Sequence, residues 1–348
     1  MLIMSVRRIL MFFLLEVLFI PMSAGQGVGG TVRLMWWNLE NFFDPVNDSL
    51  KNDDDFTAEG VNKWGYKRFE KKKNNIYKTI ISMGVDNLPV VIGVCEVEND
   101  WVLRQLCFNT PLRKFKYDFI HYDSPDNRGI DVALLYRKDY FKVLYSKPIP
   151  VKDDDDTAFC TRDILLVSGV VFEQDTLFLL LNHFPSKRGG SYAAPKRGLA
   201  AMQLEYTVDT ISSNAPGRAI VVMGDFNDTP FDESVMHTLG VSPYKKDWDK
   251  NVLINLMADI PEGRGSYKYQ GQWLNIDQIM ISKSLHPRWA TSIAVKDVDA
   301  NIYSPNFLLL YDNKFGGNKL YRTYIGPKYE GGFSDHLPIY IDIERINN

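Results

Sequence analysis

Runs of apolar residues along the chain predict a set of buried β-strands. Ile220 to Met223 form one such run, and consecutive apolar residues of this kind indicate a strand buried on both faces. Thr31 to Asn38 largely alternates between apolar and polar positions, which also favours a strand. Further strands are predicted at 88–98, 117–121, 130–136, 141–145, 164–172, 177–181 and 339–343.

Two longer segments have the periodicity of amphipathic helices. In the segment 63–83, Ile76 and Ile80 fall on one stripe, and Lys71 to Lys73 are predicted to point outward. The segment 193–212 predicts a second helix. Because strands and helices are mixed along the whole chain, the pattern indicates an α/β protein.

The N-terminal segment has the pattern of a signal peptide. Arg7 and Arg8 form a basic region, Ile9 to Ile20 an apolar core, and Ser23 to Gly25 supply small residues for cleavage. Glu16 interrupts the apolar core, and an uncleaved anchor remains the less favoured alternative. We therefore expect residues 1–25 to be removed and the protein to be exported, to the periplasm or the medium.

Residues 26–348 are predicted to form a single domain, because no internal repeat or low-complexity linker divides them. No later apolar run is long enough to span a bilayer. One segment, 301–332, is rich in Tyr and Gly and is long for a loop in a compact domain, which indicates a function. We expect the protein to be a monomer.

Charge and cysteine content restrict the class of protein. The formal net charge of −3 lacks the broad basic footprint of a protein that lives on nucleic acid, but it is compatible with an enzyme that contacts a few phosphates. The three cysteines allow at most one internal disulfide. Cys95 lies in a strand pattern and Cys107 in a helix pattern, which favours buried thiols, and no Cys/His zinc spacing is present.

Polar residues stand at or beside the ends of several predicted strands. Asp225 and Asn227 follow the strand that ends at Gly224, where open α/β sheets usually place their chemistry. Read alone, this stretch is an ordinary Asp/Asn turn before a proline. The same position relative to a strand recurs at Asn38, Glu96, Asn182, His183, Asp277, Asp335 and His336.

Each of these residues also has an ordinary structural interpretation. Asn38 could be a turn residue, and His183 a structural histidine. Asp277 lies in the second arm of a hairpin predicted at 267–281, and points either to solvent or into a site. Glu96 is harder to explain in this way, because a glutamate after a long apolar run must be paired, capped or coordinated.

The combined set fits the cleavage of a phosphate ester. A hard divalent cation takes oxygen ligands, neutralises the phosphate and stabilises the charge on the leaving group. An Asp and a His within reach of each other can activate a water molecule, and an Asn can position it.

Basic residues supply candidate contacts to the phosphate. Arg128, beside Gly129, is either a turn residue facing water or the best of these contacts. Arg197 lies near the start of a predicted helix, where the helix dipole disfavours cations, which hints at an anionic partner. Arg162, Lys187 and Arg188 are further candidates.

Seven short motifs in this order resemble the endonuclease/exonuclease/phosphatase superfamily, the relatives of deoxyribonuclease I. Each motif is weak alone, but together they extend from Asn38 to His336, nearly the whole mature chain. The motifs are Trp37-Asn38, Ile92-Gly93-x-x-Glu96, Arg128-Gly129-x-Asp131-Val132-Ala133-Leu134, Asn182-His183-Phe184-Pro185-Ser186, Gly224-Asp225-Phe226-Asn227-Asp228-x-Pro230, Ile276-Asp277-x-Ile279 and Ser334-Asp335-His336-Leu337-Pro338.

The resemblance, to an exported bacterial-type member, implies a four-layer α/β sandwich: two mostly antiparallel β-sheets packed face to face, with helices outside. It implies a Mg²⁺ cofactor, with Mn²⁺ or Ca²⁺ as alternatives, bound by Glu96 with Asn38 and Asp335 close to the metal. The similarity further implies the remaining roles. His183, Asp225, Asn227, Asp277 and His336 would be catalytic, Arg128, Asn182 and Arg197 would bind substrate, and Asp131 would orient His183.

Some roles stay open within this resemblance. His336, paired with Asp277, would orient or activate the attacking water, and Asp225 is the other candidate to take its proton. His183 is a candidate acid for the leaving oxygen. The expected activity is metal-dependent hydrolysis by a phosphodiesterase or nuclease, with nucleic acid as one substrate class. The alternatives are a phosphomonoesterase, a phospholipid or inositol-phosphate hydrolase, and a silent binding module on the same fold.

Overall fold

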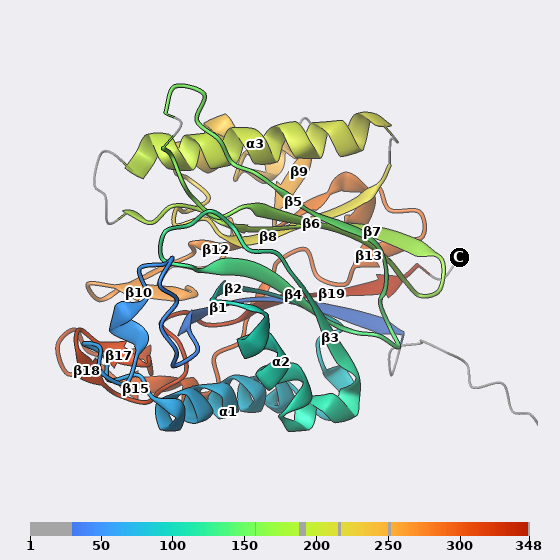
Figure 1. Cartoon of the computed structure of the whole chain (residues 1–348). Coiled ribbons are helices and arrows are strands. Elements are labelled where there is room, and N and C mark those ends of the chain that lie inside the picture. Colours follow the sequence, from blue (N-terminus) through green and yellow to red (C-terminus); the bar gives the residue numbers. More distant parts are fainter. Residues whose placement is uncertain (1–29, 157, 188–192, 215–216, 250–251, 347–348) are drawn as a thin grey trace, which may run out of the picture.

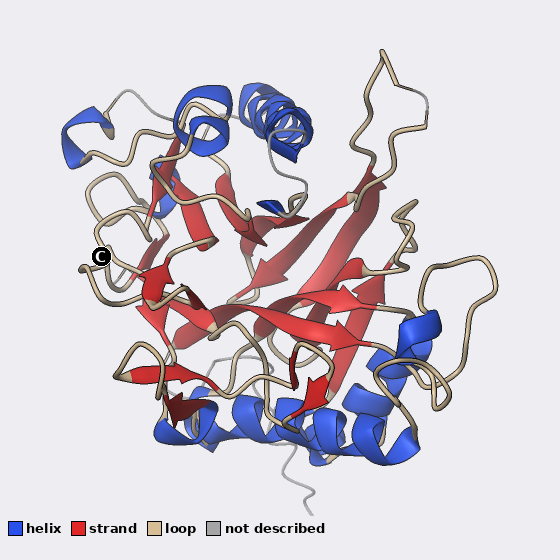
Figure 2. Ribbon diagram, turned by 90° about the vertical axis from the view of Figure 1, so that its left-hand side faces the viewer, coloured by secondary structure: helices blue, strands red, loops and turns tan. Residues whose placement is uncertain are grey.

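Two β-sheets pack face to face, with helices on both outer faces (Figure 1). The computed structural model describes residues 30–156, 158–187, 193–214, 217–249 and 252–346. The predicted signal peptide, residues 1–25, lies outside the described residues, as does Arg188. The four layers confirm the predicted α/β sandwich, and Figure 2 shows them from the side.

The first sheet has seven strands. Their spatial order is given from the edge near the C-terminus. They are β13 (Ile293–Val295), β19 (Ile339–Arg345), β1 (Thr31–Phe42), β2 (Val91–Val97), β4 (Asp131–Arg137) and β3 (Tyr117–His121), with β14 (Asn301–Ile302) also paired to β19.

The second sheet has six strands, built from the middle of the chain. In spatial order they are β5 (Lys142–Ile149), β6 (Ile164–Val171), β7 (Asp175–His183), β8 (Ala219–Asp225), β12 (Asp277–Ser282) and β9 (Leu253–Asn255). Three hairpins lie outside the two sheets: β10 (Tyr267–Tyr269) with β11 (Gln272–Leu274), β15 (Leu309–Tyr311) with β16 (Asn318–Leu320), and β17 (Tyr324–Ile325) with β18 (Lys328–Tyr329).

Each large sheet contains one parallel pair of strands among antiparallel ones. The pair is β1 with β2 in the first sheet and β7 with β8 in the second. Every other pair of described strands is antiparallel, so the prediction of mostly antiparallel sheets is confirmed. The carboxyl ends of parallel strands meet at one edge of a sheet, and each pair therefore brings two strand ends together.

Three apolar layers hold the sandwich together. The central layer lies between the sheets and includes Trp36, Cys95 and Leu181. Packing there is tight: a Cβ at Gly93 would come within 2.7 Å of the Trp36 ring. The outer layers pack α1 (Tyr66–Ser82) and α2 (Asp100–Phe108) on the first sheet, and α3 (Ala193–Asn214) on the second.

Two expectations about local structure were wrong. Lys72 and Lys73 are buried rather than outward. At Lys72 the segment 301–332 packs over the helix, and the lysine donates to Thr323 Oγ1. The predicted hairpin at 267–281 stops at Leu274, and Asp277 instead opens β12, a strand of the second sheet. Among the described helices, none is long and apolar enough to cross a membrane.

Candidate active site

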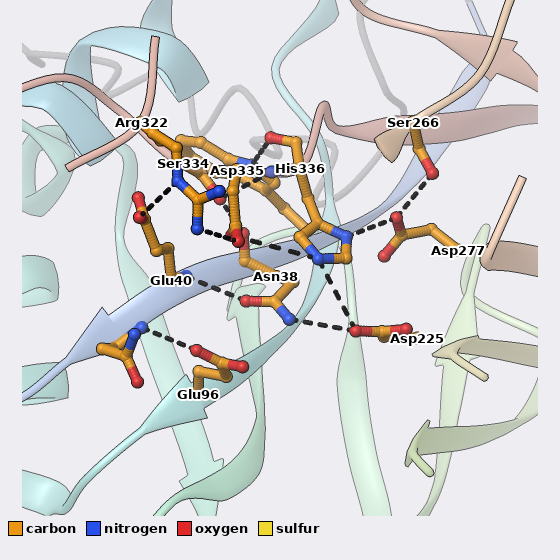
Figure 3. Close-up of polar contacts among 12 residues, drawn as sticks. Asn38, Glu40, Glu96, Asp225, Ser266, Asp277, Arg322, Ser334, Asp335 and His336 are labelled. Atoms are coloured by element: carbon orange, nitrogen blue, oxygen red, sulfur yellow. Dashed lines mark hydrogen bonds and ion pairs between the residues drawn. The ribbon is translucent and has the colours of Figure 1, made fainter. Parts of the chain in front are cut away.

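The two parallel strand pairs deliver four polar side chains to one end of the sandwich. Asn38 of β1 and Glu96 of β2 come from the first sheet, and His183 of β7 and Asp225 of β8 from the second. His183 and Asp225 face each other in the parallel register. Asn38 Nδ2 donates to Asp225 Oδ2 at 3.1 Å, so a hydrogen bond joins the two sheets at the site (Figure 3).

Glu96 leaves the regular strand alternation through a β-bulge. Its φ is 58°, and the register of β2 against both β1 and β4 shifts around this residue. The backbone N–H of Asn41 donates to Glu96 Oε2 at 2.9 Å. The other oxygen, Oε1, accepts no hydrogen bond from the described residues, which leaves it available to a ligand.

His336 forms a tight pair with Asp277. Its Nδ1 lies 2.7 Å from Asp277 Oδ2, and this carboxylate also accepts hydrogen bonds from Ser266 Oγ at 2.5 Å and from Trp36 Nε1 at 3.0 Å. The other ring nitrogen, Nε2, therefore points toward Asp225, whose Oδ2 lies 3.8 Å away (Figure 3). A carboxylate held at Nδ1 fixes the orientation of the imidazole.

The environment separates the pKa values of His336 and Asp225. Burial by itself would lower the pKa of His336, but the charges of Asp277 and Asp225 outweigh it and raise this pKa to about 10. Burial raises the pKa of Asp225 to about 7, against the opposing effect of His336. At neutral pH the imidazole of His336 is thus charged, whereas Asp225 can exchange a proton.

The surroundings of His183 have the opposite effect on the pKa of its ring. Its Nε2 lies 3.8 Å from Asp225 Oδ2 and 4.0 Å from Glu96 Oε1, but its buried Nδ1 has no hydrogen-bond partner among the described residues. Burial, reinforced by Arg162, lowers the pKa of His183 well below its usual value. This environment favours a neutral ring, which is unsuited to the protonated acid that the sequence suggested.

Asp131 does not orient His183, so this expectation was wrong. Its Oδ2 lies 3.1 Å from His121 Nε2, and its Oδ1 accepts from the backbone N–H of Ser124 at 2.9 Å. Asp131 opens β4, and His121 ends the neighbouring β3 two positions away in the register, within reach across the strands. None of the residues predicted for the site therefore orients His183.

The proposed substrate contacts divide into two groups. Arg128 lies beside the site, because its Nη2 donates at 2.6 Å to Oδ1 of Asn41, the residue that holds Glu96. Arg197 does not: it is buried in an ion pair with Asp228 at 2.6 Å, which explains the cation near the start of α3.

Asn182 is also turned away from the site. It is fully buried, and its Nδ2 donates to backbone carbonyls of Leu180 and Met223 within the second sheet. Two further basic candidates have structural partners: Arg162 donates to the carbonyl of Phe184 at 2.7 Å, and Lys187 pairs with Asp228 at 3.0 Å. Asn227 lies at the site, and its backbone N–H donates to Asp225 Oδ1 at 2.9 Å.

A network of charged residues next to Asp335 was not predicted from the sequence. Arg322 Nη2 donates to Asp335 Oδ2 at 2.7 Å, and Arg322 Nε to Glu40 Oε1 at 3.3 Å (Figure 3). The buried Lys72 lies 3.8 Å from Glu40 and donates to Thr323 Oγ1 at 2.7 Å. This network anchors the segment 301–332 to β1 and α1, and brings one of its arginines to the site.

The mouth of the site has the donor chemistry of a divalent-cation site. Glu96, Asn38 and Asp335 each carry side-chain oxygen, the ligand atom that hard cations such as Mg²⁺ prefer. The free Oε1 of Glu96 agrees with this assignment, and the residues present fit such an ion. Asp225, Asp277 and His336 form a second group whose ligand atoms lie within 4.8 Å of one another.

Comparisons with known proteins agree with this geometry. The sequence matches the Endonuclease/Exonuclease/phosphatase family over residues 33–345. No curated protein sequence matches the chain. Members of the matched family are phosphoester hydrolases and typically use divalent metals.

Solved structures share the fold at low sequence identity. The catalytic domain of human Nocturnin with bound sulfate is 18% identical, with a TM-score of 0.54, over 91% of this chain and 95% of that one. D. rerio TDP2 complexed with single strand DNA product is 14% identical, with a TM-score of 0.53, over 90% and 99% of the chains. The Bacteroides thetaiotaomicron mannosyl-6-phosphatase is 16% identical, with a TM-score of 0.53, over 91% and 100%.

Proposed function

Because this chain belongs to the endonuclease/exonuclease/phosphatase family, we propose that it hydrolyses phosphate esters with an activated water and a divalent cation. One observation carries this proposal. Asp225 is held between two histidines, with the same carboxylate oxygen 3.8 Å from His183 Nε2 and 3.8 Å from His336 Nε2. A carboxylate of raised pKa between imidazoles can take and return a proton near neutral pH.

Each side chain then has a distinct role. Asp225 takes the proton of the attacking water, because its pKa of about 7 makes it the base and His336 is already protonated. The charged His336 donates from Nε2 to a phosphate oxygen, and Asp277 holds the ring in place. The backbone N–H of Asn227 and the side chain of Asn38 fix the carboxylate of Asp225.

Glu96 is the proposed principal ligand of the cation, with Asn38 and Asp335 close to it. The bound cation would neutralise the phosphate and the charge that develops on the leaving oxygen. Mg²⁺ is the proposed ion, with Mn²⁺ or Ca²⁺ as substitutes. His183 contributes as a neutral hydrogen-bond donor, and Arg128 and Arg322 flank the site as candidate contacts to further phosphate oxygens.

We propose a phosphodiester as the substrate, with nucleic acid as the first class to examine. The D. rerio TDP2 structure of the same fold holds a single strand DNA product, which supports this choice. A phosphomonoester is the alternative, and the mannosyl-6-phosphatase of the same fold supports it. The signal-peptide pattern of residues 1–25 further supports an enzyme that acts after export. We also propose that it acts as a monomer.

The test is hydrolysis of bis-nitrophenyl phosphate and nitrophenyl phosphate, followed by DNA and RNA, with Mg²⁺ or with EDTA. We expect turnover that EDTA abolishes and Mg²⁺ restores, with the diester cleaved faster. The Glu96→Gln variant keeps the shape of the side chain and should lose activity while it retains the thermal stability of the native protein. EDTA-resistant turnover, or an active Glu96→Gln protein, would contradict the proposal.

A further inference from the structure

Cys95 places a thiol directly beside two residues of the proposed catalytic machinery. A ligand atom of Cys95, one of His183 and one of Asp225 all lie within 4.8 Å of one another. The three residues come from β2, β7 and β8, and thus from both sheets. All three are buried, with exposed fractions of 0%, 5% and 2%.

Two of these groups have unused bonding capacity. Cys95 is a free thiol, and the buried Nδ1 of His183 has no hydrogen-bond partner in the described part of the chain. A buried polar atom of this kind usually has a partner. Cys107 provides the contrast, because it is also a free buried thiol but packs among apolar residues beneath the first sheet.

We propose that Cys95, His183 and Asp225 form a binding site for a soft divalent cation, for which Zn²⁺ is the best chemical match, and that its occupation switches hydrolysis off. A sulfur, an imidazole nitrogen and a carboxylate oxygen make a donor set typical of zinc. Mg²⁺ prefers oxygen donors and would not compete at this sulfur. The ligands come from three strands, which explains why no zinc spacing appears in the sequence.

A cation bound at this position would interfere with the proposed catalysis. A cation held there would engage the carboxylate that we propose as the base and the neighbouring His183. This inhibitory half of the inference rests on the proposed function, whereas the binding half does not. Glu96 Oε1, 4.0 Å from His183 Nε2, lies on the partly exposed side, from which the cation would enter.

Binding requires one proton to leave. The free thiol of Cys95 carries a proton before the metal arrives, since the ordinary pKa of a cysteine is about 8.5. The S–H bond breaks as the S–metal bond forms, and the proton passes to solvent. Neutral His183 gives up no proton, and no oxidant or reductant is needed.

The binding half is tested with Co²⁺, which reports a thiolate ligand through a charge-transfer absorption band in the near ultraviolet. Every protein carries Cys160→Ser, which removes the exposed thiol. We expect the band in the parent and in the matched control Cys107→Ala, its loss in Cys95→Ala, and displacement of Co²⁺ by Zn²⁺. Cys95→Ser is a second variant in case the alanine protein does not fold.

The inhibitory half is tested by adding Zn²⁺ to turnover assays in excess Mg²⁺. We expect Zn²⁺ to inhibit the parent, and Cys95→Ala to need more than about tenfold higher Zn²⁺, since even outer-shell partners of a metal usually contribute that much. A parent without the thiolate band, or a Cys95→Ala protein with unchanged inhibition, overturns the inference. Zinc binding through Cys95 in a protein that hydrolyses nothing would instead support this site and refute the proposed function.

Discussion

The site contains two histidines that reach the same oxygen of Asp225 from different surroundings. His336 and His183 each place Nε2 3.8 Å from Asp225 Oδ2. Behind His336 lies a carboxylate, Asp277, at 2.7 Å, whereas Nδ1 of His183 has no partner among the described residues. The pKa of His336 is accordingly raised to about 10, and that of His183 lies well below its usual value.

This comparison shows that the charged groups next to an imidazole determine its protonation state and therefore its role. Both rings are buried, and burial lowers the pKa of each. Asp277 reverses the effect at His336, while Arg162 and Arg128 reinforce it at His183. We therefore infer that one histidine works as a cation and the other as a neutral donor, although both are equally close to the base.

The largest effect is expected when the shared carboxylate is removed. Asp225→Asn keeps the side-chain shape but cannot accept the proton of the water, and kcat should fall by about 10²- to 10⁴-fold. Kinetics at saturating substrate would measure this loss. Asp232→Asn is a suitable control, because this carboxylate pairs with Lys187 at the surface. Retention of activity by Asp225→Asn would assign the base elsewhere.

An intermediate effect is expected when the difference between the histidines is erased. In the native protein, activity should rise as Asp225 loses its proton near pH 7 and fall as His336 loses its own near pH 10. Asp277→Asn removes the charge that raises the pKa of His336. The alkaline limb should therefore move to lower pH, and kcat should fall by about 10- to 100-fold.

The pH profile of kcat for Asp277→Asn against the native protein measures both effects. Ser266→Ala is the control, since it removes only a hydrogen bond to the same carboxylate. An alkaline limb that stays in place in Asp277→Asn would mean that His336 does not set it.

The sequence predicted those residues of the candidate site whose position follows directly from the strand pattern. Asn38, Glu96, His183 and Asp225 stand at the ends of apolar strands, and the periodicity of those strands is visible in the chain. The four-layer architecture came from the family resemblance and is confirmed. Local pattern was sufficient here because parallel strand pairs bring their carboxyl ends together.

Pairings between distant residues could not be predicted in the same way. The pairs of Asp131 with His121 and of Arg197 with Asp228 depend on which strands and loops become neighbours. Lys72 looked like a solvent-exposed lysine, yet it contacts Thr323, which lies 251 residues later. The charged groups next to His336 and His183 also come from distant parts of the chain. The sequence alone therefore left the roles of the two histidines open.

The smallest effect is expected at the histidine without a partner. His183→Gln replaces one neutral hydrogen-bond donor by another, and the loss of an optimal neutral bond corresponds to about tenfold in kcat. Because the ring of His183 is neutral across the working range, the shape of the pH profile should not change. Parallel profiles of kcat for the variant and the native protein make the comparison. A loss as large as that of Asp225→Asn, together with a missing limb of the profile, would show that His183 is a charged acid after all. The two histidines would then differ in partners but not in role.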